Sequence, residues 1–257
     1  MNSQLLNVAI QSFTLLRRDR IFVPAVIGGL LVAFIAYEAS TFVSEGAYKV
    51  LFDIGSFGFH VLGALIAIFW GSKSINDSKA EGSLELQLSA PVSRPIWFLG
   101  KYFGLSAILI LLFVAYAISF QVLAYVTRDI VYDYQHFLSL GLFAVEWLAI
   151  AAMASCFSTF SSFTVAFSVS ILFWIVGLIS AGASRIMENS DALIGKVFID
   201  LVSSVWNLQA FNTARLVTSG AAADPSNWGP RFLYGLTIIA IFCTIGMIAL
   251  GRKDPIT

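Results

Sequence analysis

Very few residues of this chain have the types and spacing that catalysis or nucleotide binding requires. A loop that cradles nucleotide phosphates needs Gly, four further residues, and then Gly-Lys-Ser or Gly-Lys-Thr. The two Gly-Lys pairs are Gly100-Lys101 and Gly195-Lys196, but Tyr102 and Val197 follow them, and neither pair has a glycine five positions earlier. The Gly-x-Ser-x-Gly pattern of many hydrolases does not occur either. The sequence therefore predicts no ATPase site and no catalytic residue in this chain.

Glu146 is the one carboxylate that lies well inside a long apolar run. An ionised group at that depth in a bilayer is costly, and such residues usually face protein or water. Two interpretations stay open: a pathway residue that meets substrate or a proton, or a hydrogen-bonded packing residue between helices. The sequence favours packing, because no second intramembrane charge offers a partner. His60 is interpreted as a packing histidine, and His60 and His136 form no ligand cluster, so no metal site is predicted.

The composition excludes an ordinary soluble domain. Of the 257 residues, 58% are hydrophobic and only 12% are charged, against about 25% charged residues in a typical soluble domain. Mean hydropathy is +0.86. One soluble core could not bury this much apolar surface, so a bilayer must solvate most of it. The net charge is zero and basic residues do not gather as nucleic-acid binding requires, so no nucleic-acid partner is expected.

The apolar residues fall into separate runs of the length that spans a bilayer as a helix. About 20 residues cross the roughly 30 Å of hydrocarbon. The alternating pattern of a membrane β-barrel is absent, which leaves helices as the spanning structure. The sequence predicts a single all-α integral membrane domain over 1–257 with about six transmembrane helices, at 21–37, 54–70, 102–126, 137–157, 163–182 and 232–250.

Lysine and arginine positions predict the orientation. With both termini in the cytoplasm, the inner segments hold nine Lys and Arg residues and the outer segments hold six. The bias is strongest before the first span, where Arg17, Arg18 and Arg20 precede it and Glu38 and Glu45 follow it. Positive charge favours the cytoplasmic side. We therefore expect a multi-pass protein of the cell membrane with both termini inside.

The N-terminal segment 1–20 is predicted to form an interfacial helix that turns into the first span. Leu6, Ile10 and Phe13 recur at helical spacing, with polar residues on the other side. An early start of the first span is the alternative. It is disfavoured because the basic LRRDR run at 16–20 would be costly inside the bilayer.

The outer loop 183–231 also has helical periodicity. Leu193, Val197, Leu201, Val205 and Leu208 recur at spacings of three or four. The loop is therefore predicted to contain one or two short amphipathic helices that lie against the membrane or partly re-enter it.

The cytoplasmic loop 71–101 carries the most informative pattern. Leu84 and Leu88 lie one helical turn apart, Glu85 lies beside them, and Pro91 ends the helix. A short helix of mixed surface is therefore predicted to protrude into the cytoplasm. It serves either as a docking helix for a soluble partner or as an ordinary loop helix packed on the membrane.

The run EGSLELQLSAPVSR at 81–94, followed by Gly100-Lys101, resembles the signature of ABC-2 type permeases, the membrane subunits of export-type ATP-binding-cassette transporters. In that family the pattern lies between the second and third helices, at the coupling helix that seats in the ATPase. The N-terminal interfacial helix, the six spans and the helical outer loop are also similar to that family. The segment NLQAFNTARL at 207–216 is similar to one in permeases associated with copper-enzyme maturation.

The resemblance implies a membrane subunit of an exporter that dimerises, as a homodimer, and binds two copies of a separate ATPase. ATP and Mg would be held by that ATPase and no cofactor by this chain. The residues implied in coupling to the ATPase are Glu81, Leu84, Glu85, Leu88 and Arg94. Arg17, Arg18 and Arg20 would set the elbow helix against lipid headgroups or the ATPase.

The resemblance further implies the inner membrane of the cell as the location, and it leaves room for an extracytoplasmic accessory protein. It does not name a substrate: lipid, glycan, peptide, drug and maturation factor all stay open. Two other classes of function also stay open. An ion-gradient-driven secondary transporter would normally show inverted repeats and paired intramembrane charges. A membrane anchor that recruits a cytoplasmic protein would need no transport pathway.

Overall fold

The structure is a computed structural model that describes residues 2–43, 45–80, 93–126, 134–187, 193–212 and 228–251. These residues are almost entirely helical. The elements, in chain order, are α1 (Asn2–Arg17), α2 (Phe22–Thr41), α3 (Ala47–Ala80), α5 (Arg94–Val126), α6 (Tyr134–Phe160), α7 (Phe163–Met187), α8 (Leu193–Val205), the 3₁₀ turn η1 (Leu208–Phe211) and α10 (Trp228–Gly251). Six of them, α2, α3, α5, α6, α7 and α10, are long and apolar enough to cross a membrane. The all-α fold with six spans is thereby confirmed.

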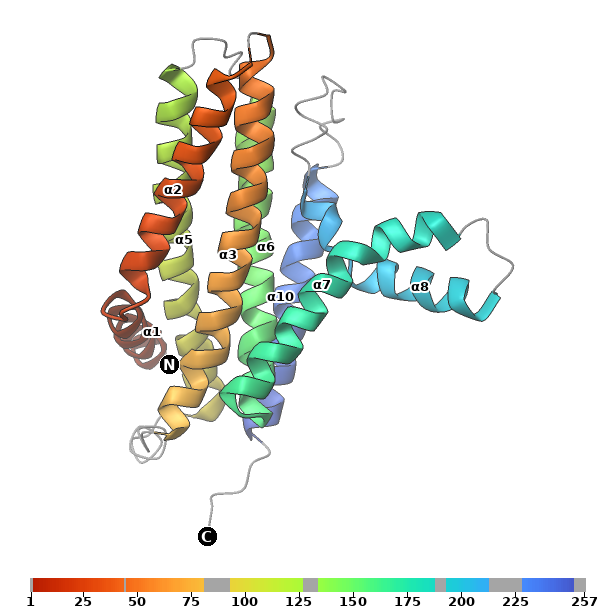
Figure 1. Ribbon diagram of the computed structural model, residues 1–257. Helices are drawn as coiled ribbons and strands as arrows, with labels where there is room; N and C mark the ends of the chain where they lie inside the picture. Colours follow the sequence, from red (N-terminus) through yellow and green to blue (C-terminus); the bar gives the residue numbers. More distant parts are fainter. Residues whose placement is uncertain are drawn as a thin grey trace.

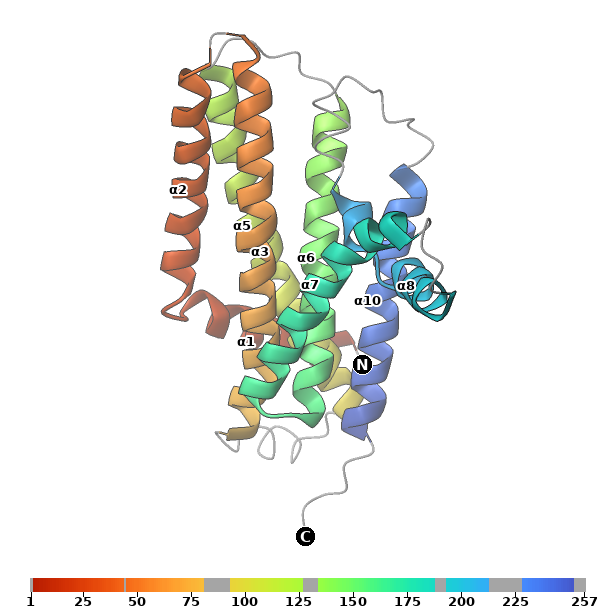
Figure 2. The same cartoon turned by 45° about the vertical axis from the view of Figure 1, so that its right-hand side comes forward.

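The spans form a bundle with α6 at its centre (Figures 1 and 2). α6 packs against α3, α5, α7 and α10. In its most apolar stretch 72% of the residues are buried, against 22% in α2, which lies at the periphery. α7 crosses the bundle obliquely and leads into α8, and these two helices project sideways as a hairpin. The middle part of α6 therefore lies mostly inside the protein, away from lipid.

One end of the bundle gathers several functional segments (Figure 1). α1 lies across this end, and Ala80, Arg94 and Gly251, which end α3, begin α5 and end α10, lie there too. We call it the elbow end. The described residues begin with α1 and end with α10 on this side, as an even number of spans requires. That this side faces the cytoplasm remains a prediction from the positive charges.

The inner and outer faces of the spans differ in side-chain volume more than in polarity, because both the core and the lipid-facing surface are apolar. On α2 the buried positions are small residues at helical spacing: Ala25, Gly29, Ala33, Ala36 and Ser40. Larger apolar side chains on the same helix, such as Leu31 and Phe34, are exposed. Lipid chains are as apolar as leucine, so close packing of small residues, and not hydrophobicity, distinguishes the inner face.

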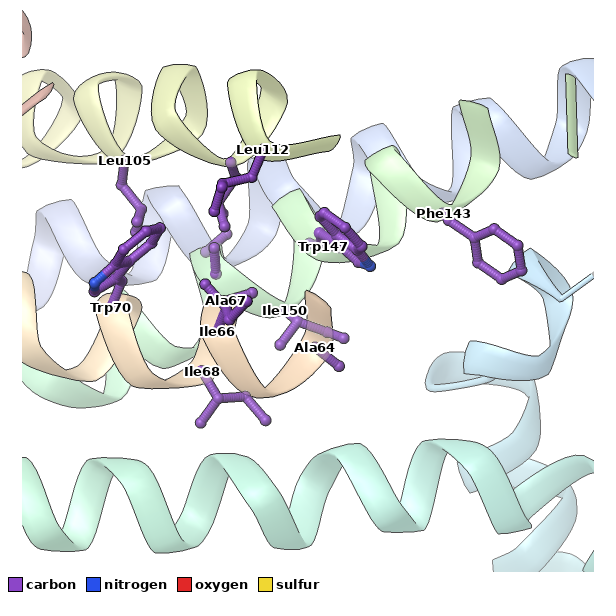
Figure 3. Packing of buried hydrophobic residues seen from close by; sticks show 14 of the residues in the cluster. Ala64, Ile66, Ala67, Ile68, Trp70, Leu105, Leu112, Phe143, Trp147 and Ile150 are labelled. Atoms are coloured by element: carbon purple, nitrogen blue, oxygen red, sulfur yellow. The ribbon is translucent and has the colours of Figure 1, made fainter. Parts of the chain in front are cut away.

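α3, α5 and α6 meet around large buried side chains (Figure 3). Trp147 of α6 and Trp70 of α3 are fully buried in this cluster with Leu105 and Leu112 of α5. Gly63 makes the approach of α3 to α6 possible, since a Cβ there would lie 1.7 Å from the indole of Trp147. Any larger residue at position 63 would push the two helices apart.

α3 and α5 continue well beyond the predicted spans. The 34 residues of α3 correspond to about 51 Å of helix, longer than the roughly 30 Å of hydrocarbon. Ser78 is buried inside this helix and its hydroxyl donates to the Ser74 carbonyl at 3.2 Å. α3 is therefore still packed on the bundle in its last turns, and residues 81–93 separate it from α5 in the sequence.

The loop predicted at 183–231 contains helical structure, as expected. α7 continues to Met187, and α8 and η1 follow it. Val197, Leu201 and Val205 form an exposed apolar stripe on α8. Beyond α8 the chain packs back on the bundle: the Trp206 indole donates to the Phe173 carbonyl of α7 at 2.7 Å. The Tyr234 hydroxyl of α10 accepts from the Asn207 amide at 2.8 Å and donates to the Val205 carbonyl at 3.0 Å.

The predicted orientation can be tested at two exposed positions that lie at opposite ends of the bundle. Lys49 lies in the first turn of α3 at the far end, and Ser93 precedes α5 at the elbow end. The native Cys156 and Cys243 are buried, so they should react slowly. With a membrane-impermeant maleimide on intact cells, Lys49→Cys should be labelled and Ser93→Cys should be labelled only after permeabilisation. The reverse pattern would overturn the orientation.

Candidate functional site

A histidine and a glutamate meet in the centre of the bundle. His60 Nδ1 of α3 lies 2.9 Å from Glu146 Oε2 of α6. The two residues are 3% and 0% exposed. The expectation that Glu146 has no ionisable partner inside the membrane is therefore wrong. The depth of the two residues could have indicated the pair, since each lies in the middle part of its predicted span, at 54–70 and 137–157.

Aromatic rings enclose the pair. The His60 ring lies 5.8 Å from the ring of Phe143 and 6.1 Å from that of Trp174 on α7, measured between centroids. The other carboxylate oxygen, Glu146 Oε1, has no hydrogen-bond partner among the residues that the structure describes. Because the pair is buried, an isolated charge would be expensive there, and the contact with His60 offsets that cost. The arrangement therefore fits a polar packing contact that joins α3 to α6.

The elbow helix α1 is held on two sides. It lies across α5 so closely that a Cβ on Gly104 would come within 2.5 Å of the Ala9 carbonyl oxygen. Where α1 turns into α2, Asp19 Oδ2 accepts from Lys73 Nζ of α3 at 2.6 Å. The other oxygen of Asp19 accepts from the Ile21 amide at 3.1 Å. A charge-assisted hydrogen bond of this kind fixes the turn against α3.

The three arginines that the sequence singled out lie around this turn. Arg17 ends α1, and the side chains of Arg17, Arg18 and Arg20 are exposed. They are thus placed to meet groups outside the chain, while Asp19, between them, makes the internal contact. Sequence reasoning did not single out Asp19 or Lys73, because their pairing depends on how α1 lies relative to α3.

Each of the two helices that flank the 81–93 segment donates a hydrogen bond from a basic side chain to the C-terminal end of another helix. Lys79 Nζ, in the last turn of α3, donates to the Ser158 carbonyl and, at 3.0 Å, to the Thr159 carbonyl of α6. Arg94 Nη1, at the start of α5, donates to the Leu250 carbonyl of α10 at 3.3 Å. Arg94 was predicted to be a coupling residue, and Lys79 was not singled out. The other predicted coupling residues, Glu81, Leu84, Glu85 and Leu88, lie outside the described residues.

The His60–Glu146 contact predicts non-additive effects on stability. Glu146→Leu leaves His60 buried without its partner, and His60→Leu does the same to Glu146. The double variant removes both groups, so it should be less destabilised than the sum of the single variants by about 1 kcal/mol, the scale of a hydrogen bond between membrane helices. Reversible unfolding in mixed micelles measures this cycle. Strictly additive effects would show that the two side chains do not interact.

A comparison with protein families supplies the remaining evidence. The family model of the ABC-2 family transporter protein matches residues 3–254. The match covers α1, all six spans and the segment between α3 and α5. No curated protein sequence matches the chain. Since the family match covers nearly the whole chain and the described residues form six membrane helices, this protein belongs to the ABC-2 transporter family as a multi-pass membrane permease.

Proposed function

We propose that this chain is the membrane subunit of an ATP-driven exporter that works as a homodimer with two copies of a separate ATPase. One observation carries the proposal: the 81–94 segment, which resembles the coupling region of ABC-2 permeases, joins two helices that are longer than the hydrocarbon is thick and whose ends at Ala80 and Arg94 lie at the elbow end. We infer that α3 extends beyond the hydrocarbon at this end, so that a soluble subunit can reach the segment. The family match over residues 3–254 supports the same class of partner.

In this proposal the ATPase binds ATP and Mg and this chain binds neither. Leu84 and Leu88 form the apolar stripe of a short helix that seats in a groove of the ATPase, with Glu81 and Glu85 at its polar border. Closure of the ATPase dimer moves this helix. Because α3 and α5 are long continuous helices, they carry the movement into the bundle.

The elbow end faces the cytoplasm in this proposal, and the protein lies in the inner membrane of the cell. Arg17, Arg18 and Arg20 then lie at the level of the cytoplasmic headgroups, where basic residues are favoured. The α7–α8 hairpin, which projects sideways from the bundle in Figure 1, offers a surface for an extracytoplasmic accessory protein. The segment at 207–216 favours the copper-enzyme-maturation branch of the family.

A second candidate function is transport driven by an ion gradient, and the His60–Glu146 pair favours it. A buried pair of titratable groups can take up and release a proton. We favour a packing role for Glu146, because Trp174, Phe143 and the close approach at Gly63 leave the pair enclosed between helices.

The docking helix is tested by Leu84→Asp. A carboxylate on the apolar stripe would be buried without a partner in the ATPase groove, at a cost of several kcal/mol. The ATPase should be lost when the tagged permease is purified, while the permease still elutes as a single folded species. Leu86→Asp is the matched control, since two residues along a helix place position 86 on the opposite face. Undiminished co-purification with Leu84→Asp would show that this segment is not the contact.

The role of Glu146 is tested by Glu146→Gln in complexes reconstituted with the ATPase in lipid nanodiscs. Glutamine keeps the shape and a hydrogen bond to His60 but cannot ionise. If Glu146 is a packing residue, the variant complex should hydrolyse ATP at close to the wild-type rate. A protonophore added to proteoliposomes that contain the variant complex should not change that rate. A folded, ATPase-bound variant without activity would show that the packing role is wrong and would place proton or substrate chemistry at the pair.

A further inference from the structure

We propose that Lys79 and Arg94 are the positioning residues that carry movement of the 81–93 segment to α6 and α10. This inference rests on the proposed function, because it takes that segment as the contact with the ATPase. It adds which helices respond to the contact and which side chains connect them.

The first connection joins α3 to α6. Lys79 is the second-last residue of α3, and its ammonium group donates to the carbonyls of Ser158 and Thr159. α6 ends at Phe160, so both carbonyls belong to the last turn, where no further backbone amide of the helix can reach them. A cation at this position also meets the negative end of the helix dipole. Since Ser158 and Thr159 are buried, Lys79 reaches into the bundle to make this contact.

The second connection uses the same chemistry between a different pair of helices. Arg94 is the first residue of α5, and its guanidinium donates to the carbonyl of Leu250, the second-last residue of α10. The two residues therefore flank the 81–93 segment, one before it and one after it. Each binds the C-terminal end of a helix that lies far away in the sequence. A displacement of the segment pulls on both helix ends together.

α6 and α10 are placed to carry such a displacement across the membrane. They pack against each other along the bundle. At its other end α10 holds the segment after α8, through Tyr234 and through Arg231, whose guanidinium donates to the Ala210 carbonyl. The pull thus runs along rigid helices from the elbow end to the outer loop. α2 packs on α3 and α5 at the periphery of the bundle and serves as the reference helix.

The experiment measures how far α10 moves relative to α2 when the ATPase closes. Spin labels are placed at Leu233→Cys near the start of α10 and at Thr41→Cys at the end of α2, both exposed, with Cys156 and Cys243 replaced by alanine. Labelled protomers are diluted into unlabelled ones, and the complexes with the ATPase are held in nanodiscs. Distances are compared without nucleotide and with ATP, Mg and vanadate.

The double variant Lys79→Met, Arg94→Met keeps long side chains but removes both contacts. It should lose most of the distance shift seen in the parent, while the ATPase stays bound. Lys79→Arg with Arg94→Lys keeps both cations and should restore the shift. Lys49→Met removes an exposed cation at the opposite end of α3 and should leave the shift unchanged.

The outcomes separate this inference from the proposed function. If the parent complex binds no ATPase, the proposed function fails. If it binds the ATPase but shows no shift, the inference is wrong, because α10 does not respond to closure of the ATPase. If the parent shifts and the methionine variant shifts equally, Lys79 and Arg94 do not transmit the movement and the inference is wrong. Loss of the ATPase from a folded methionine variant would also overturn it, since the two residues would then be docking contacts. Should the double variant fail to fold, an undiminished shift in both single variants would refute it.

Discussion

The interior of a bilayer offers no hydrogen-bond partner to a polar group, and this constraint shapes the whole protein. It makes every spanning segment a helix, because only a helix satisfies its own backbone. It also explains why a histidine and a glutamate in the centre of the bundle meet as a pair. His60 and Glu146, on different helices, are buried together at 2.9 Å. The carboxylate would be costly alone, so the contact between α3 and α6 is where a polar group can be tolerated.

The same constraint explains what the basic side chains at the elbow end bind. A helix leaves its last carbonyls without partners, and they need donors wherever water is excluded. Lys79 and Arg94 supply such donors to α6 and α10, and Lys73 binds Asp19 at the turn of the elbow. These three contacts connect α1, α3, α5, α6 and α10 at the elbow end. The two helices that flank the 81–93 segment, α3 and α5, therefore contact other helices of the bundle as well as leading to the ATPase contact that we propose.

Packing inside the bundle depends on shape more than on polarity. α6 lies at the centre, in contact with α3, α5, α7 and α10, and Gly63 lets Trp147 fit against α3. α2 turns its small residues inward and its large apolar residues outward. A helix on the surface of a water-soluble protein would instead turn apolar residues inward and polar residues outward. Here the outer face meets lipid, so volume alone separates the two faces.

The sequence by itself determined the features that depend on local pattern. Hydropathy over 20 residues located the six spans, helical periodicity located α1 and the stripe of Val197, Leu201 and Val205 on α8, and the 81–94 run indicated the family. Only the tertiary structure decided which distant residues meet. Glu146 pairs with His60, Lys79 caps α6, Arg94 caps α10, and Asp19 binds Lys73. The physical reason is that buried and lipid-facing positions are equally apolar, so hydropathy does not reveal which faces of two helices pack together, and contacts between polar side chains follow from that packing.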